Sequence, residues 1–184
     1  MSSARMSAKY VSVLLFFGFF ALCVSYKLYP VITPDIPANT NLTTGPFVRI
    51  GTGYYFFELN NKKNWYEAYE TCRTMNAELI TIETIEEWNI INRYIRDTNI
   101  DYSYWTSGTD LGKEGYHTWF SSGKPININI WDPGMPNNVD NLQHCDEMGW
   151  RDGVRSGLND RQCEFLNRYI CEAKQPVTAS FVLW

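Results

Sequence analysis

Two stretches of the chain place hydrophobic residues at the three- and four-residue spacing of an amphipathic helix. In the first stretch, Trp65, Tyr69 and Cys72 fall on one face. Asn64 precedes them as a helix N-cap, and Glu67 follows three residues after it. A helix that begins after residue 64 and carries a cysteine is therefore predicted.

The second stretch has the same two signals. Thr84 and Glu87 stand three residues apart, which is the spacing of a capping box. Trp88, Ile91 and Ile95 then mark one hydrophobic face. A second helix, with that face turned to a core, is therefore predicted directly downstream of the first.

Strand patterns surround the two predicted helices. Residues 54–57 are an aromatic run of strong strand formers. From residue 102 onward, short aromatic segments alternate with glycine-rich turns, and two short strands are expected around Cys163 and Cys171. The polar loop from Trp131 to Gln143 is long, and such loops are usually functional or disordered. Two helices followed by strands and loops indicate an α+β fold.

The N-terminus has the pattern of a secretory signal. Arg5 and Lys9 precede an apolar stretch over residues 11–24, which is shorter than the roughly 20 residues that span a bilayer. We expect residues 1–25 to be a cleaved signal peptide, so that the mature protein has no membrane span and is extracellular. The alternative is an uncleaved anchor, which would make the chain a type II membrane protein.

Residues 26–46 are expected to form an extended linker, because they contain three prolines followed by polar residues. Asn41 begins an N-glycosylation sequon. The folded domain is predicted over residues 47–174, and residues 175–184 form a C-terminal tail.

Charge and motif content narrow the function. The net charge of −4 comes with no basic run, so nucleic acid is not an expected partner. The chain has two histidines, His117 and His144, and no nucleophile elbow, phosphate loop or metalloprotease motif. We therefore do not expect an enzyme.

Four of the five cysteines lie beyond the predicted signal peptide, which contains Cys23. An even number in an exported chain predicts disulfides, and four cysteines allow three pairings that spacing alone does not distinguish. A zinc site is disfavoured, since no two cysteines lie two to four residues apart.

The domain carries tryptophans, glycines, cysteines and polar pairs in a fixed order. The series is Trp65-x-x-Ala68-x-x-x-Cys72, Leu79, Trp105, Gly108, Trp119, Gly123, Trp131-x-x-Gly134-x-Pro136-Asn137-Asn138, Cys145, Asn159-Asp160, Cys163 and Cys171. This series resembles the C-type lectin-like domain family, and the overall pattern is most similar to secreted single-domain insect lectins.

The resemblance implies the family fold: two helices, small antiparallel sheets and a long-loop region. Members with four cysteines pair the first with the fourth and the second with the third. The implied disulfides are therefore Cys72–Cys171 and Cys145–Cys163. The resemblance also implies a cis peptide bond before Pro136.

In sugar-binding members of the family, calcium in the long loop coordinates two sugar hydroxyls. The resemblance places Asn137, Gln143, Asn159 and Asp160 at calcium-ligand positions, and the first three are also sugar-binding candidates. Met135 replaces a Glu or Gln, and Gln143 replaces a Glu. Calcium prefers charged oxygen ligands, and a thioether is a poor one. The sequence therefore predicts weak or absent calcium binding.

These residues also have purely structural interpretations. Asn159 and Asp160 suit an Asx turn before a strand, and Asn137 suits an ordinary loop. Asp132 and Asp140 are alternative calcium ligands if the loop rearranges. The tryptophans Trp105, Trp119 and Trp131 are expected to pack in the fold rather than to stack on sugars, and Glu147 and Glu164 are expected to be solvated.

The resemblance leaves two functions open. The first is a secreted carbohydrate-binding protein, with glycans or glycoproteins as partners and a degenerate calcium and sugar site. The second is a calcium-independent module on the same fold, with a protein ligand. A hydrolase is retained only as a contrast.

Overall fold

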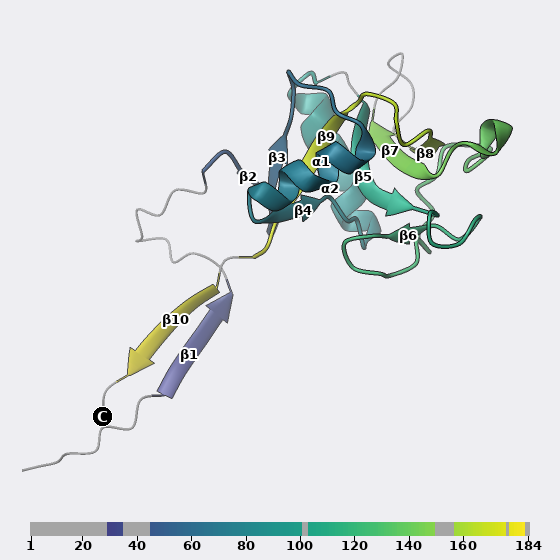
Figure 1. Ribbon diagram of the computed structural model, residues 1–184. Helices are drawn as coiled ribbons and strands as arrows, with labels where there is room; N and C mark the ends of the chain where they lie inside the picture. Colours follow the sequence, from purple (N-terminus) through teal and green to yellow (C-terminus); the bar gives the residue numbers. More distant parts are fainter. Residues whose placement is uncertain (1–28, 35–44, 101–102, 150–156, 176, 183–184) are drawn as a thin grey trace, which may run out of the picture. The chain divides into compact units, whose positions relative to one another are not determined.

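The computed structural model describes residues 29–34, 45–100, 103–149, 157–175 and 177–182 (Figure 1). The predicted signal peptide, residues 1–25, and the sequon at Asn41 lie outside these residues. The chain divides into two compact units, and the second spans Ile36–Pro176.

The described part of the first unit is a two-stranded antiparallel sheet. Strand β1 (Tyr29–Pro34) pairs with β10 (Val177–Val182). Strand β1 falls within the predicted linker and β10 within the predicted C-terminal tail. No pattern in the sequence predicts that these two distant segments pair.

The second unit is built around a sheet of short strands. Along the chain its elements are β2 (Val48–Ile50), β3 (Gly53–Phe57), α1 (Trp65–Thr74), β4 (Ala77–Leu79), α2 (Ile85–Asp97), β5 (Ser103–Thr109), β6 (Thr118–Trp119), η1 (Val139–Asn141), β7 (Cys145–Gly149), β8 (Leu158–Arg161) and β9 (Arg168–Ala173). The strand order is β2-β3-β9-β5-β7-β8, with β4 paired to β9 and β6 to β5. The predicted fold class is confirmed with one difference: β5 and β9 run parallel, so the sheet is mixed and not wholly antiparallel.

Both helices begin at their predicted caps. The Asn64 side chain accepts a hydrogen bond from the Glu67 backbone N–H at 2.8 Å. The Thr84 hydroxyl accepts one from the Glu87 backbone N–H at 3.1 Å. Each cap satisfies an N–H group that the first helical turn leaves without a partner.

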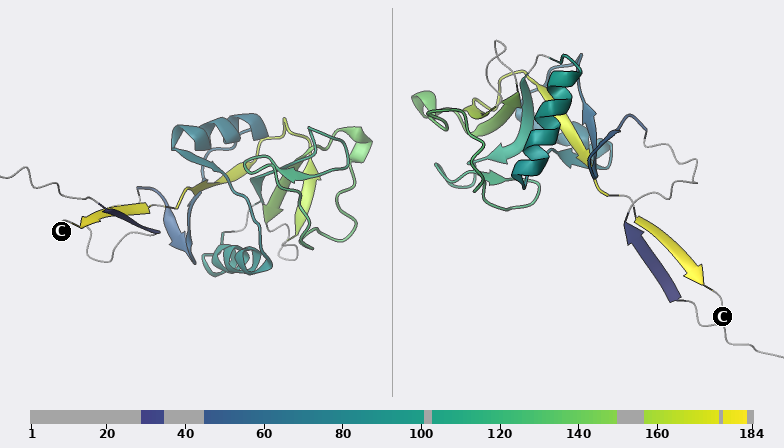
Figure 2. Two further views of the ribbon diagram at one scale, coloured as in Figure 1. Left: turned by 90° about the horizontal axis from the view of Figure 1, so that it is seen from below. Right: turned by 180° about the vertical axis from the view of Figure 1, so that it is seen from behind.

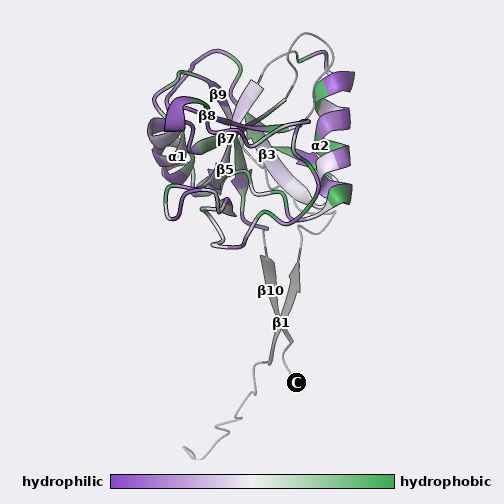
Figure 3. Cartoon of the chain, turned by 90° about the vertical axis from the view of Figure 1, so that its right-hand side faces the viewer, coloured by the Kyte–Doolittle hydropathy of each residue, from purple (hydrophilic) through white to green (hydrophobic). Residues whose placement is uncertain are grey.

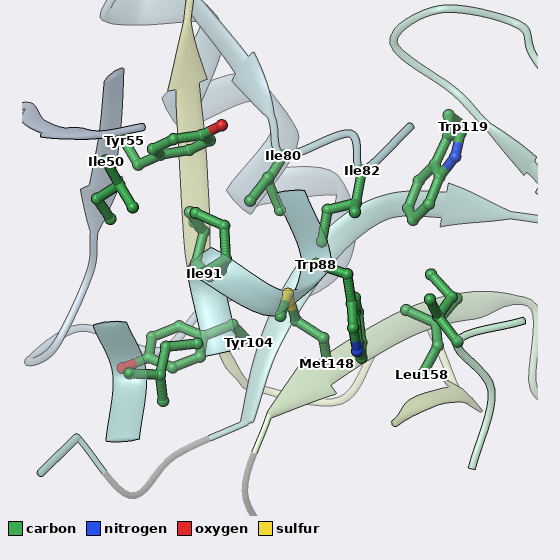
Figure 4. Packing of buried hydrophobic residues seen from close by; sticks show 13 residues of the cluster. Ile50, Tyr55, Ile80, Ile82, Trp88, Ile91, Tyr104, Trp119, Met148 and Leu158 are labelled. Atoms are coloured by element: carbon green, nitrogen blue, oxygen red, sulfur yellow. The ribbon is translucent and has the colours of Figure 1, made fainter. Parts of the chain in front are cut away.

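The helices lie on opposite sides of the strands, and each covers its own part of the core (Figure 3). Helix α2 buries Trp88, Ile91 and Ile95 in a cluster with residues of the loop after β4 and of β7 (Figure 4). Helix α1 buries Trp65, Ala68 and Cys72 in a second cluster. The periodicity of the sequence thus identified the buried faces correctly.

Both implied disulfides are present. Cys72 of α1 bonds Cys171 of β9, with 5.3 Å between their Cα atoms. Cys145 of β7 bonds Cys163, with 5.2 Å between the Cα atoms. The first disulfide ties α1 to the sheet, and the second joins the start of β7 to the segment after β8.

Candidate functional site

The long loop between β6 and β7 projects from the body of the second unit (Figure 2). Its first half is fastened to β8, since Asp132 donates its backbone N–H to the Leu158 carbonyl at 2.9 Å. The Met135–Pro136 bond is cis, as the resemblance implied. Asn138, Asp140 and Asn141 all have a positive φ. Asn and Asp tolerate this left-handed region better than most residues, so the sequence suits the loop's unusual course.

The Asp160 carboxylate is hydrogen-bonded to the backbone of the loop. Asp160 lies on β8 and is fully buried. Both of its oxygens lie 3.0 Å from the Asn137 backbone nitrogen, and Oδ2 lies 2.6 Å from the Asn138 backbone nitrogen. The carboxylate therefore accepts two loop N–H groups, and charge-assisted bonds of this kind are stronger than neutral ones.

Side-chain amides fasten the rest of the loop. Gln143 Oε1 accepts the Val139 N–H at 3.0 Å, and Asn138 Oδ1 accepts the Gln143 N–H at 3.0 Å. The Asn138 amide also donates to Glu114 Oε1 at 3.2 Å, which links this loop to the one after β5. The Asn137 side chain is exposed and makes no hydrogen bond to any other described residue.

Asn159 belongs to a different cluster. Successive side chains of a strand point to opposite faces, and β8 alternates between partly buried Asn159 and buried Asp160. The Asn159 amide donates to Glu147 Oε1 at 3.1 Å, and Arg161 and Asn167 donate to the same carboxylate. The structure therefore brings Asn137, Gln143 and Asp160 together but directs the Asn159 amide elsewhere.

Glu147 corrects one expectation. The sequence suggested a solvated charge, but its side chain is only 3% exposed. It lies on β7, an inner strand that pairs with β8 on one side and β5 on the other. Three side-chain donors surround it, which is the usual requirement for a buried carboxylate.

The loop residues fit a calcium ion poorly in this arrangement. Calcium needs six to eight oxygen ligands. Here the Asp160 oxygens and Gln143 Oε1 already accept backbone N–H groups, and Met135 supplies sulfur. Among the described residues, no three His, Cys, Asp or Glu side chains are arranged to hold a metal ion.

Two aspartates and two histidines form a cluster of hydrogen-bonded pairs near the loop. No pattern in the sequence predicted that they meet. His117 Nδ1 lies 2.9 Å from Asp146 Oδ1, and His144 Nδ1 lies 2.9 Å from Asp110 Oδ1. Asp146 is the register partner of Asp160. The sheet register therefore decides which acids meet, and this register is not visible in the sequence.

Burial dominates the electrostatics of this cluster. It raises the pKa of Asp146 to about 6, although the hydrogen bond from His117 works in the opposite direction. Burial by itself would lower the pKa of His117, but the hydrogen bond and charge of Asp146 outweigh it and the pKa is raised. The pair therefore favours a protonated imidazole next to a carboxylate.

The tryptophans pack as expected. Trp105 and Trp119 are 0% and 2% exposed, respectively. Trp131 is partly buried, and its ring meets that of His117 edge-on at 4.9 Å. Trp105 and Trp119 are therefore too deeply buried to stack on a sugar.

A second acidic region lies between β3, β4, β9 and α2. Its cavity measures about 600 Å³ and is lined by Tyr55, Glu78, Glu87 and Glu172, among others. Glu78 and Glu172 are directly opposite on adjacent strands. Burial, followed by the charge of Glu87, raises the pKa of Glu172 to about 7. The Tyr55 hydroxyl donates to Glu87 Oε1 at 2.8 Å.

Neither helix has the length and hydrophobicity that a membrane-spanning segment needs, as far as the described residues go.

Comparisons with known proteins agree with the fold. The family model of the lectin C-type domain matches residues 61–173. C-type lectin 37Da of Drosophila melanogaster is 40% identical over 154 residues, which cover 80% of this chain and 82% of that protein. C-type lectin mosGCTL-7 of Aedes aegypti is 27% identical over 128 residues, which cover 66% and 85%.

Solved structures show the same architecture. The mouse scavenger receptor C-type lectin carbohydrate-recognition domain superposes with a TM-score of 0.62 at 24% identity. The match covers 73% of this chain and 98% of that one. The family model and the 40% identical relative, in agreement with the two disulfides, show that this chain belongs to the C-type lectin family.

Proposed function

We propose that this chain is an extracellular glycan-recognition protein whose binding loop is held by its own hydrogen bonds and not by a tightly bound calcium ion. Membership of the lectin family supports glycan binding. The signal-like N-terminus and the two disulfides support an extracellular location. The family and the absence of a catalytic motif in the sequence support a role in binding without catalysis.

The Asp160 carboxylate is the observation that carries the proposal. A calcium ion in this loop would compete with the Asn137 and Asn138 N–H groups for the same oxygens. Gln143 would have to release the Val139 N–H as well. Calcium affinity also depends on ligand charge, and only Asp160 among the predicted ligands is a carboxylate. Calcium would therefore gain little and displace several existing bonds.

Asn137 is the residue best placed to contact a saccharide. Its amide is exposed and has no partner among the described residues, so it has donors and an acceptor free for sugar hydroxyls. Because Asp160 fixes the adjacent backbone, the amide is presented from a preorganised loop. Preorganisation lowers the entropic cost of binding.

A glycan array run with the oxidised full chain tests this function. We expect the same glycans to bind in calcium and in excess EDTA. Binding that disappears in EDTA would contradict the calcium-independent part of the proposal. If no glycan bound in either calcium or EDTA, glycan binding itself would be contradicted.

Calcium titration of a redesigned loop tests the explanation. Met135→Glu combined with Gln143→Glu adds two carboxylates, and we expect calcium to raise the Tm of this variant but not of the unmodified chain. Asn89→Asp combined with Gln162→Glu is the matched control, because it adds the same charge at exposed positions. Stabilisation of the unmodified chain by sub-millimolar calcium would show that the existing ligands suffice.

A calcium-independent protein-interaction module is the alternative. The hydrophobic side chains Leu111 and Tyr116, 46% and 49% exposed, favour it, because they lie on the loop that Glu114 joins to Asn138. This second function would be established if no glycan on the array bound the chain and if a protein ligand bound it without competition from any glycan.

A further inference from the structure

Strands β1 and β10 form a sheet of their own, and neither strand pairs with any other described strand (Figure 1). A two-stranded sheet is marginally stable in water, and three or more strands are usually needed for independent stability. The two outer edges of this sheet are therefore the places where a further strand would add stability.

The two prolines of β1 determine which of its backbone groups face outward. In an antiparallel pair, residues that bond across the ladder alternate with residues whose N–H and C=O groups point to the outer edge. Proline has no N–H, so Pro30 and Pro34 occupy outward positions and the ladder bonds fall to residues 29, 31 and 33. At the three outward positions of β1, only Ile32 has an N–H group to offer.

The outer edge of β10 lacks this protection. The register places residues 177, 179 and 181 opposite the three outward positions of β1, so their N–H and C=O groups point outward as well. Strand β10 contains neither a proline nor a charged residue, and these are the residues that commonly protect an edge from another strand. One edge of the sheet is therefore blocked by proline, and the other is open to a strand.

A second copy of β10 fits the open edge. Antiparallel pairing about a twofold axis at Ala179 would place Ala179 opposite Ala179 of the second copy, and Val177 opposite Phe181 of the second copy. All of these positions carry outward groups, so the two strands would form about six backbone hydrogen bonds. No charged residue lies in β10, so no like charges would meet across the axis.

The same pairing would stop at two chains. In the resulting four-stranded sheet, both outer edges are formed by β1 and are blocked by Pro30 and Pro34. A twofold interface is closed in this way, whereas an open edge on each side would allow a filament to grow. A dimer therefore covers the open edge of each chain and leaves no other open edge in this sheet.

We propose that this chain forms a homodimer through antiparallel pairing of β10 with β10 of a second copy. The proposal goes beyond the proposed function and does not depend on whether the chain binds glycans.

Sedimentation equilibrium of the full chain, expressed for secretion and oxidised, tests the proposal with two proline variants. Ala179→Pro removes the outward N–H at the centre of the interface, and we expect the dissociation constant of the dimer to rise at least about tenfold. Ile32→Pro is the matched control, because Ile32 is the register partner of Ala179 and its N–H points to the opposite edge. This control should leave the dissociation constant within about twofold of that of the unmodified chain.

Cysteine cross-linking locates the interface without weakening it. In the twofold register, the two Cα atoms at position 179 would lie about 5.5 Å apart, which is a separation that a disulfide spans. Ala179→Cys should therefore give a covalent dimer on a non-reducing gel, and Ile32→Cys should not.

A chain that stays monomeric at every concentration would overturn the proposal. A dimer whose dissociation constant Ala179→Pro leaves unchanged would also overturn it, because another surface would then hold the two chains together. If both proline variants weakened the dimer equally, selective cross-linking by Ala179→Cys would support the proposal and its failure would overturn it.

Discussion

Two carboxylates of the second unit, those of Asp160 and Glu172, are shielded from water in opposite surroundings. At the loop, Asp160 is fully buried and accepts the backbone N–H groups of Asn137 and Asn138. In the cavity beside α2, Glu172 accepts one backbone N–H, that of Thr81 at 3.2 Å, and is directly opposite Glu78. The first carboxylate has donors directed at it, whereas the second has another acid as its neighbour.

The difference shows how environment decides the role of an acid. A buried carboxylate that receives several N–H groups stabilises the segment that donates them. Partial burial and neighbouring carboxylates both favour the protonated form of Glu172, so its pKa rises. Asp160 therefore acts as a structural anchor for the loop, and Glu172 makes the stability of the domain depend on pH.

The largest expected effect is at the anchor. Asp160→Ala should cost about 3 kcal/mol of unfolding free energy, because two loop N–H groups lose a charged acceptor. Urea denaturation measures this loss, and hydrogen exchange should show faster exchange at Asn137 and Asn138. Asp160→Asn should cost less, since one oxygen acceptor remains. If Asp160→Ala cost no more than Glu164→Ala at an exposed position, Asp160 would not be an anchor.

The next effect depends on pH and has the opposite sign. The folded-state pKa of Glu172, about 7, lies above its ordinary value of 4.5. The domain is therefore favoured below about pH 4.5 and loses stability as the pH rises through 7. Glu172→Gln should remove this loss and stabilise the domain at pH 8 by about 1–3 kcal/mol, with little change at pH 4.

Urea denaturation of both proteins at pH 4, 6 and 8 measures this effect. The difference between the two proteins isolates Glu172 from the Asp146–His117 pair, which titrates in both. Equal stabilities at pH 8 would mean that Glu172 is solvated in the folded state.

A smaller effect is expected at the second fastening of the loop. Gln143→Ala should cost about 1 kcal/mol, because the Val139 N–H loses its acceptor. Gln143→Glu keeps an oxygen in that place and should be close to neutral. Thermal unfolding of the two variants makes the comparison, and equal losses would indicate that the amide nitrogen of Gln143 matters and its oxygen does not.

The smallest effect is expected at the rim of the acidic cavity. Lys124 pairs with Glu83 at 2.8 Å, but both side chains are largely exposed, at 62% and 43%. Lys124→Ala should cost less than about 0.5 kcal/mol, and salt should reduce the loss further. A loss above about 1 kcal/mol would show that Lys124 compensates the buried acids as well as Glu83.

Several features were predictable because their signals are local. The caps at Asn64 and Thr84 and the buried face of α2 depend on residues within a few positions of one another. The disulfide pairing came from the family resemblance, since spacing left three pairings open. The antiparallel description of the sheet was incomplete, because nothing local reports that β5 and β9 run parallel.

The candidate site was only partly predictable. Asn137, Gln143 and Asp160 do gather at the loop. The Asn159 amide turns to Glu147 instead, because neighbours on β8 point to opposite faces. The fastening of Asn138 to Glu114 had no signal in the sequence, since these residues lie on separate loops.

The sequence by itself determined the two helices and the position of a long polar loop, since short-range spacing carries that information. The family and its disulfide pairing came from the resemblance that the order of its motifs carries. The resemblance also implied that Met135 and Gln143 replace two ligands that are typical of the family's calcium site. Only the tertiary structure decided how the remaining acid is used, because hydrogen bonds depend on which groups the sheet register brings together. Asp160 accepts backbone N–H groups, which makes it a structural anchor. Glu172 lies opposite another carboxylate, which makes it a pH-sensitive group.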